Sequence, residues 1–82
     1  MKTELTTNRR QRPVHQDARG DYVLRDGTGD GYVIERSRCD TGPKLVGWLN
    51  HLLGKDWFTK EHAARLIQFA AVDFPEAIDF NM

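Results

Sequence analysis

Side chains that can act as nucleophiles, bases or metal ligands are few in this chain and far apart in the sequence. The chain has one cysteine, Cys39, and three histidines, His15, His51 and His62. Covalent catalysis needs a nucleophile next to a base, and structural zinc sites need cysteines or histidines paired a few residues apart. The spacing of these residues fits neither pattern, even when Asp56 is included. We therefore expect no enzymatic activity, no metal site and no cofactor.

The stretch Asp26–Val33 resembles the first eight positions of the calcium-binding loop of EF-hand proteins. In that resemblance Asp26, Thr28 and Asp30 would supply oxygen ligands. The twelfth loop position, which holds a bidentate carboxylate in EF-hands, falls on Ser37. Aspartate and glycine at these positions are also typical of a tight turn. The sequence therefore favours a turn with an acidic tip, formed by Asp26 and Asp30, over a calcium site.

Short β-prone runs lie on both sides of this turn. They cover residues 22–24 and 32–34, and each contains a tyrosine and β-branched or branched apolar residues. Two such runs joined by a glycine-rich turn predict a β-hairpin. A two-stranded hairpin is only marginally stable in water, so other elements must pack against it.

Two helices follow the hairpin in the sequence. Apolar residues at helical spacing predict a helix over 43–53, with Pro43 as its first residue and Gly54 just past its end. Thr59 is a good N-cap residue, and the same spacing of apolar residues predicts a second helix over 60–73. The short link between the helices makes them antiparallel neighbours.

These elements predict an α+β fold in which an N-terminal β-hairpin packs on two antiparallel α-helices. The single small domain spans residues 21–74. Residues 1–20 carry five basic and two acidic residues and show no apolar periodicity, so we expect a flexible basic arm. Residues 75–82 carry two acidic residues and no basic one, and form an acidic tail that either packs on the domain or adds a third strand.

Charge, cysteine content and hydropathy restrict the class of partner and the cellular location that we expect for the protein. Twelve basic and twelve acidic residues cancel in the 82-residue chain, which is unlike the strongly basic character of most nucleic-acid-binding domains. No apolar run approaches the roughly 18 residues of a membrane span, and the first twenty residues lack an apolar signal segment. A single cysteine allows no internal disulfide. We therefore expect a cytoplasmic protein with no membrane partner.

The chain contains more large apolar side chains than a two-helix core can easily hide, and an exposed surplus of this kind is typical of an interface. We expect a small non-enzymatic protein that binds a larger protein as a regulator, adaptor or inhibitor, a type often encoded by phages and mobile elements. Homodimerisation through the same surplus stays open. The expected contact residues are Trp57, Phe58, Phe69 and Val72, with Asp26 and Asp30 as an electrostatic contact.

The alternative is a nucleic-acid-binding module that uses the basic arm and the second helix. The segment Phe58–Leu66 resembles the opening helix of excisionase- and MerR-type winged-helix domains, which implies DNA binding. It departs from that family because the predicted helix continues to residue 73 instead of turning into a recognition helix. Arginines on a flexible arm can bind phosphates. The residues assigned to this alternative are Arg9, Arg10, Arg12, Arg19, Lys60 and Arg65.

Overall fold

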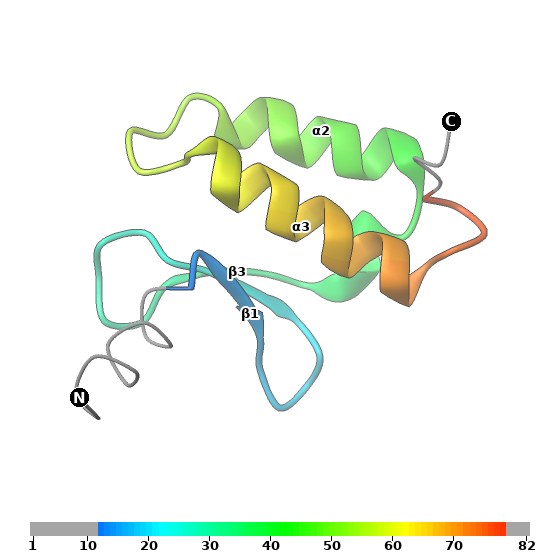
Figure 1. Cartoon of the computed structure of the whole chain (residues 1–82), viewed down its shortest axis with the longest axis horizontal. Coiled ribbons are helices and arrows are strands. Elements are labelled where there is room, and N and C mark those ends of the chain that lie inside the picture. Colours follow the sequence, from blue (N-terminus) through cyan, green and yellow to red (C-terminus); the bar gives the residue numbers. More distant parts are fainter. Residues whose placement is uncertain (1–11, 79–82) are drawn as a thin grey trace.

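The structure is a computed structural model that describes residues 12–78. It confirms the α+β class, with a small antiparallel sheet followed by two antiparallel helices. Figure 1 shows both helices on the same side of the sheet. The elements in chain order are β1 (Val14–Gln16), β2 (Tyr22–Leu24), β3 (Tyr32–Ile34), the 3-10 helix η1 (Arg36–Cys39), α2 (Gly42–Leu52) and α3 (Lys60–Asp73).

The sheet has one strand more than the hairpin that the sequence predicted. Its order is β1-β2-β3, and both pairs are antiparallel. The extra strand β1 lies in residues 14–16, within the segment expected to be a flexible arm. Val14 pairs with Leu24 and its side chain is buried, which attaches this segment to the core. The folded domain therefore begins before residue 21, and a three-residue strand is too short to show a period in the sequence.

Local capping explains where α2 begins. The Lys44 N–H donates to the Thr41 side-chain oxygen over 3.3 Å, and Pro43 lies in the first turn, where its missing N–H costs nothing. Leu45 and Leu52 are the buried residues of this helix. Leu53 is the C-cap, so the predicted range was correct to within one residue at each end.

Helix α3 covers the predicted range and ends at its C-cap Phe74. Its buried residues are His62, Leu66 and Ala70, which lie one helical turn apart and face the sheet and α2. A turn follows, and Ile78 is buried at 7% exposure. The described part of the predicted acidic tail therefore packs on the domain, and the third strand of the sheet comes from β1 instead.

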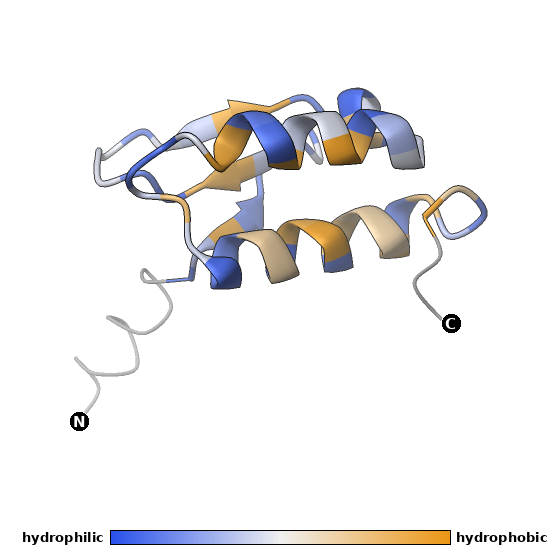
Figure 2. Ribbon diagram, turned by 90° about the horizontal axis from the view of Figure 1, so that it is seen from above, coloured by the Kyte–Doolittle hydropathy of each residue, from blue (hydrophilic) through white to orange (hydrophobic). Residues whose placement is uncertain are grey.

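The core lies between the sheet and the two helices. Figure 2 shows strands that are mainly hydrophobic and helices that alternate hydrophobic and hydrophilic turns. On the sheet, Tyr22, Leu24 and Ile34 are at most 1% exposed. None of the helices formed by residues 12–78 is long and apolar enough to cross a membrane. The buried hydrophobic cluster contains Val14, Tyr22, Leu24, Ile34, Cys39, Leu45, Leu52, Leu66, Ala70 and Ile78.

A polar contact fixes the end of α3 against the first two strands. Asp73 Oδ2 accepts hydrogen bonds from Tyr22 Oη over 2.7 Å and from Gln16 Nε2 over 3.0 Å. Burial of the phenol, together with its bond to the Asp73 carboxylate, raises the pKa of Tyr22 well above its ordinary value. Tyr22 therefore stays a hydrogen-bond donor at all physiological pH values. This contact explains how β1, which is only three residues long, is held in the fold.

The buried thiol of Cys39 gives a testable pH dependence. Burial, reinforced by the neighbouring Asp40 carboxylate, raises the pKa of Cys39 from 9.0 to about 11. As the pH rises, the thiol ionises in the unfolded chain before it ionises in the folded chain, which stabilises the unfolded chain. The stability that the buried neutral thiol contributes is therefore complete below pH 9 and is lost between pH 9 and 11. We expect the difference in free energy of unfolding between wild type and Cys39→Ala, measured in urea, to be smaller at pH 10.5 than at pH 8. An unchanged difference would contradict the assignment.

Candidate functional site

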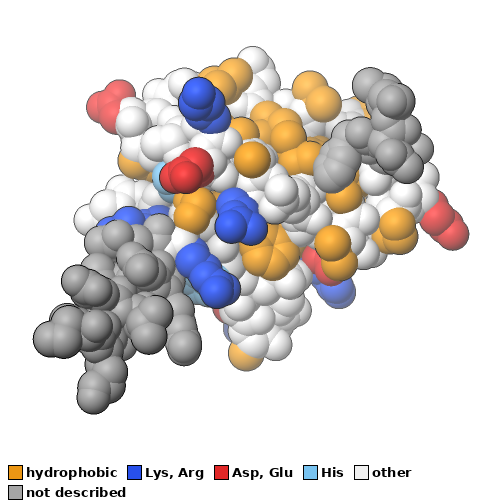
Figure 3. All heavy atoms as spheres, viewed as in Figure 1, with side chains coloured by type: hydrophobic (Ala, Val, Ile, Leu, Met, Phe, Trp, Pro, Cys, Tyr) orange, Lys and Arg blue, Asp and Glu red, His pale blue; other side chains and the backbone are white. Residues whose placement is uncertain are grey.

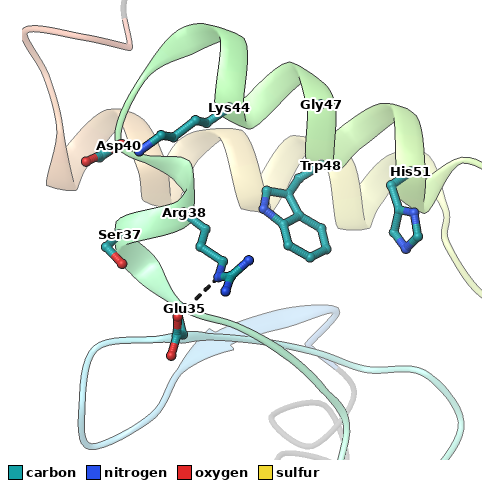
Figure 4. A pocket seen from close by; sticks show the side chains of 8 residues that line it. All are labelled: Glu35, Ser37, Arg38, Asp40, Lys44, Gly47, Trp48 and His51. Carbon is teal, nitrogen blue, oxygen red and sulfur yellow. Dashed lines mark hydrogen bonds and ion pairs between the residues drawn. The ribbon is translucent and has the colours of Figure 1, made fainter.

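A groove lies between η1 and α2, and we call it the η1–α2 groove. Its volume is about 790 Å³, compared with about 260 Å³ for a hollow beside α3. Figure 4 shows Arg38, Trp48 and His51 pointing into one space between α2 and the chain that leads into Glu35. The residues that line the groove are Glu35, Ser37, Arg38, Asp40, Lys44, Gly47, Trp48 and His51.

The charged residues of the groove form two ion pairs. Arg38 Nε lies 3.1 Å from Glu35 Oε1, and Lys44 Nζ lies 3.0 Å from Asp40 Oδ1. No hydrogen bond within residues 12–78 reaches Asp40 Oδ1, so the Lys44 ammonium compensates this solvent-shielded atom. The Arg38–Glu35 pair is exposed, and pairs of this kind contribute only about 0–1 kcal/mol to stability. The groove therefore offers both signs of charge, and a bound partner can exchange the Arg38–Glu35 pair, whereas Lys44 stays needed beside the shielded Asp40 oxygen.

An aromatic wall closes the groove on the side of α2. The half-buried indole ring of Trp48 packs edge-on against His51, with ring centroids 5.6 Å apart, and against Tyr32 at 6.5 Å. The indole N–H makes no hydrogen bond with any residue that the structure describes. A ligand in the groove therefore meets an apolar ring together with an indole N–H donor, a combination typical of interface tryptophans.

The groove holds no preassembled catalytic pair. Ser37 and His51 both line it, but neither side chain forms a hydrogen bond with another residue between 12 and 78. A nucleophile that acts through a base needs such a contact, although it often tightens only when substrate binds. No cluster of three or more His, Cys, Asp or Glu residues suited to a metal ion occurs in the described part of the chain.

Trp57 and Phe58 were predicted as exposed contact residues, and the structure places them in a packed aromatic cluster. Both are half-buried. The centroid of the Trp57 ring lies 5.4 Å from that of Tyr32 and 5.5 Å from that of His62. The ring centroids of Phe58 and His62 are 5.6 Å apart. They connect the α2–α3 loop to β3, so they are less accessible than the sequence suggested. Their role in binding a partner stays a prediction.

Phe69 and Val72, the other two predicted apolar contacts, lie together on α3. They line the hollow of about 260 Å³ with Gln16, Gln68 and Arg65. Val72 is 78% exposed. Phe69 is half-buried and packs on Tyr22, with ring centroids 6.0 Å apart. The two residues therefore form a small second apolar surface, separate in its lining residues from the η1–α2 groove.

The acidic tip is occupied by turn contacts. Asp26 Oδ1 accepts hydrogen bonds from the Thr28 side chain over 2.6 Å and from the Thr28 N–H over 3.0 Å, which lowers the pKa of Asp26. Asp30 lines a hollow of about 130 Å³ that also contains Arg12, His15 and Arg25. Asp26 therefore stabilises the loop, as the turn interpretation predicted, while Asp30 lies among basic side chains.

The residues assigned to nucleic-acid binding lie on several elements. Arg9 and Arg10 are outside the described residues. Arg12 lines the hollow of about 130 Å³ that Asp30 also lines. Lys60 begins α3, and Arg65, one turn further on, lies beside Phe69 and Val72. On the face shown in Figure 3, basic and acidic side chains are interspersed. A turn follows α3, so the winged-helix resemblance is confined to one helix within residues 12–78, and nucleic-acid binding stays a prediction.

Sequence reasoning missed the η1–α2 groove, although one signal for it was present. Lys44, Trp48 and His51 are spaced four and three residues apart, which places them on one face of the predicted helix. Trp48 also belongs to the apolar stripe that predicts this helix, and such a stripe usually faces the core. The η1 helix, which supplies the opposite wall, has no periodic pattern and was not predicted.

The comparisons with known proteins add no relative. No family model, no curated protein and no solved structure matches this chain. Functional inference therefore rests on the site itself.

Proposed function

We propose that this protein is a non-catalytic docking module that holds a segment of a larger partner protein in the η1–α2 groove. The observation that carries the proposal is the combination, in one open groove, of a half-buried tryptophan with the exposed Arg38–Glu35 ion pair and the partly shielded Lys44–Asp40 ion pair. Tryptophan and arginine are enriched among the residues that dominate protein interfaces. Regulator, adaptor or inhibitor are the roles that suit a docking module of this size.

The charge pattern favours a protein partner over a polyanion. Glu35 and Asp40 lie beside Arg38 and Lys44, so a phosphate backbone in the groove would meet two carboxylates with the two cations. A polypeptide carries both signs of charge and can replace the exposed Arg38–Glu35 pair with intermolecular ion pairs. The single buried thiol and the lack of disulfides suit a reducing, cytoplasmic setting.

The proposal predicts which substitutions remove partner binding. Tagged wild type and variants are used to capture proteins from a nuclease-treated lysate, and the affinity for the captured partner is then measured. We expect Trp48→Ala and Arg38→Glu each to weaken binding at least about 30-fold, the scale of an interface hot spot. Circular dichroism checks that both variants are folded.

Two controls separate this proposal from its alternative. Val46→Ala changes an exposed residue of α2 that does not line the groove, and it should leave binding unchanged. Lys60→Glu removes a cation assigned to nucleic-acid binding. Full binding by Arg38→Glu would reject the groove. Capture of nucleic acid from an untreated lysate that is lost both on nuclease treatment and in Lys60→Glu, with no protein captured after nuclease treatment, would favour the nucleic-acid alternative.

A further inference from the structure

Within residues 12–78, the strand β3 forms an edge of the sheet, with β2 as its neighbour on one side. An edge strand presents backbone N–H and C=O groups that can pair with another chain. Proteins often protect such edges with charged side chains, proline or a bulge. The central residue of β3 is Val33, which is uncharged and 53% exposed. The accessible groups of this edge can be identified from the hydrogen-bond pattern.

The pairing of β1 with β2 fixes the direction of each peptide group in β2. The Arg25 N–H donates to the Pro13 carbonyl over 2.8 Å, and the Asp17 N–H donates to the Asp21 carbonyl over 3.0 Å. In an antiparallel pair, hydrogen-bonded and non-hydrogen-bonded positions alternate. The backbone groups of Val23 therefore face β1, and those of its two neighbours in β2 face β3.

The same alternation continues into β3. Tyr32 and Ile34 are opposite Leu24 and Tyr22, so their backbone groups point to β2. The N–H and C=O of Val33 then point away from β2, toward the free edge. Gly31 and Glu35 have the same orientation as Val33, but the Gly31 N–H donates to Thr28 Oγ1 over 3.2 Å and the Glu35 carbonyl accepts from the Arg38 N–H over 2.9 Å. Val33 is therefore the centre of the accessible edge, and Glu35 also lines the η1–α2 groove. The free edge and the groove are therefore adjacent parts of one surface.

We infer that the partner segment binds as an extended strand that pairs with the free edge of β3 around Val33. This inference rests on the proposed function and specifies the kind of segment that the groove receives. The residue of the added strand opposite Val33 places its side chain on the face of the sheet away from the helices. The residues on either side of it point to the helix layer, where Trp48 and Arg38 line the groove.

The groove favours a segment of another protein over the β3 strand of a second copy. In a second copy, the side chains that would point to the helix layer are Tyr32 and Ile34. Ile34 is 1% exposed in its own core, and Tyr32 packs on Trp48 and Trp57 of its own chain. They are not free to fill a neighbour's groove, whereas a separate segment brings side chains of its own. We expect an apolar or aromatic residue at the position that meets Trp48.

The test uses a phage-displayed library of random 12-residue linear peptides, selected on the folded chain. A selected peptide is synthesised, and its Kd is measured by fluorescence anisotropy. Val33→Pro removes the edge N–H without removing a hydrogen bond to β2, since proline is tolerated at such edge positions. Val33→Thr, which keeps the N–H, is the matched control. We expect at least tenfold weaker binding for Val33→Pro and less than threefold change for Val33→Thr.

Other outcomes separate this inference from the proposed function. Binding that survives Val33→Pro but is lost in Trp48→Ala would overturn strand addition and leave groove docking intact. Binding that survives both substitutions would overturn both. A wild-type dimer in light scattering that Val33→Pro converts to a monomer would show that a second copy covers the edge, which also overturns the inference. If Val33→Pro does not fold, hydrogen exchange at the wild-type Val33 amide decides, because strand addition must slow it when the peptide binds.

Discussion

Replacing Gly31 with alanine is expected to destabilise the domain by roughly 2–5 kcal/mol, the combined scale of backbone strain and overpacking. Gly31 has a φ of +82°, which disfavours any residue with a Cβ atom. An added Cβ would lie 2.8 Å from Val23 Cγ1 and 3.2 Å from the Leu24 carbonyl oxygen. The carbonyl cannot move away easily, because Leu24 lies in the central strand and its backbone groups pair with Tyr32 in β3.

The same loop supplies matched controls for this prediction. Gly27 has a φ of +91° but open space around it, so Gly27→Ala should show backbone strain alone, about 1–2 kcal/mol. Gly29 has neither a positive φ nor a close neighbour, and Gly29→Ala should change stability by less than about 1 kcal/mol. Urea unfolding of the three variants measures the free energy of unfolding and shows which variant loses most stability. Equal stability of Gly31→Ala and Gly29→Ala would show that the loop is free to move off Val23.

Replacing His62 with alanine should cost about 2–4 kcal/mol, because it leaves two backbone groups without partners and removes ring contacts. The Thr59 N–H donates to His62 Nδ1 over 3.1 Å, so the ring proton lies on Nε2. Nε2 then donates to the Arg25 carbonyl oxygen over 2.6 Å. The ring also packs against Trp57 and Phe58 and is only 7% exposed. This side chain joins the start of α3 to the end of β2.

His51 provides the control of the same residue type. It is exposed on α2, where its ring packs edge-on against the Trp48 ring, so His51→Ala should change stability by less than about 0.5 kcal/mol. His62→Gln keeps a side-chain acceptor for the Thr59 N–H and should fall between the two. Thermal and urea unfolding of the three variants provide the measurement. Similar values for His62→Ala and His51→Ala would remove His62 from the contacts that hold the helices on the sheet.

Much of the fold was predictable because it is encoded locally. The apolar stripes of α2 and α3 repeat over three to four turns, and Thr59 marks the start of α3 through the capping interaction that it forms. The hairpin was predictable because its turn combines aspartate with glycines, two of which adopt positive φ. The sequence also indicated correctly that the Asp26 carboxylate belongs to a turn.

The remaining features depend on contacts between residues far apart in the chain. Strand β1 is three residues long and is held by Asp73, more than fifty positions later, which accepts from Gln16 and Tyr22. His62 lies in the first turn of a helix, where its sequence position gives no sign of burial, and the approach of the Arg25 carbonyl explains why it is buried.

The sequence by itself therefore determined the class of fold, the two helices with their caps, and the turn between β2 and β3, because each depends on a local or periodic pattern. The tertiary structure alone decided the candidate site. The η1–α2 groove exists because η1 directs the chain from the edge of the sheet into α2, which brings Glu35 and Arg38 opposite Trp48 and His51. The free peptide groups of Val33 are likewise set by strand order and register, which no single segment specifies.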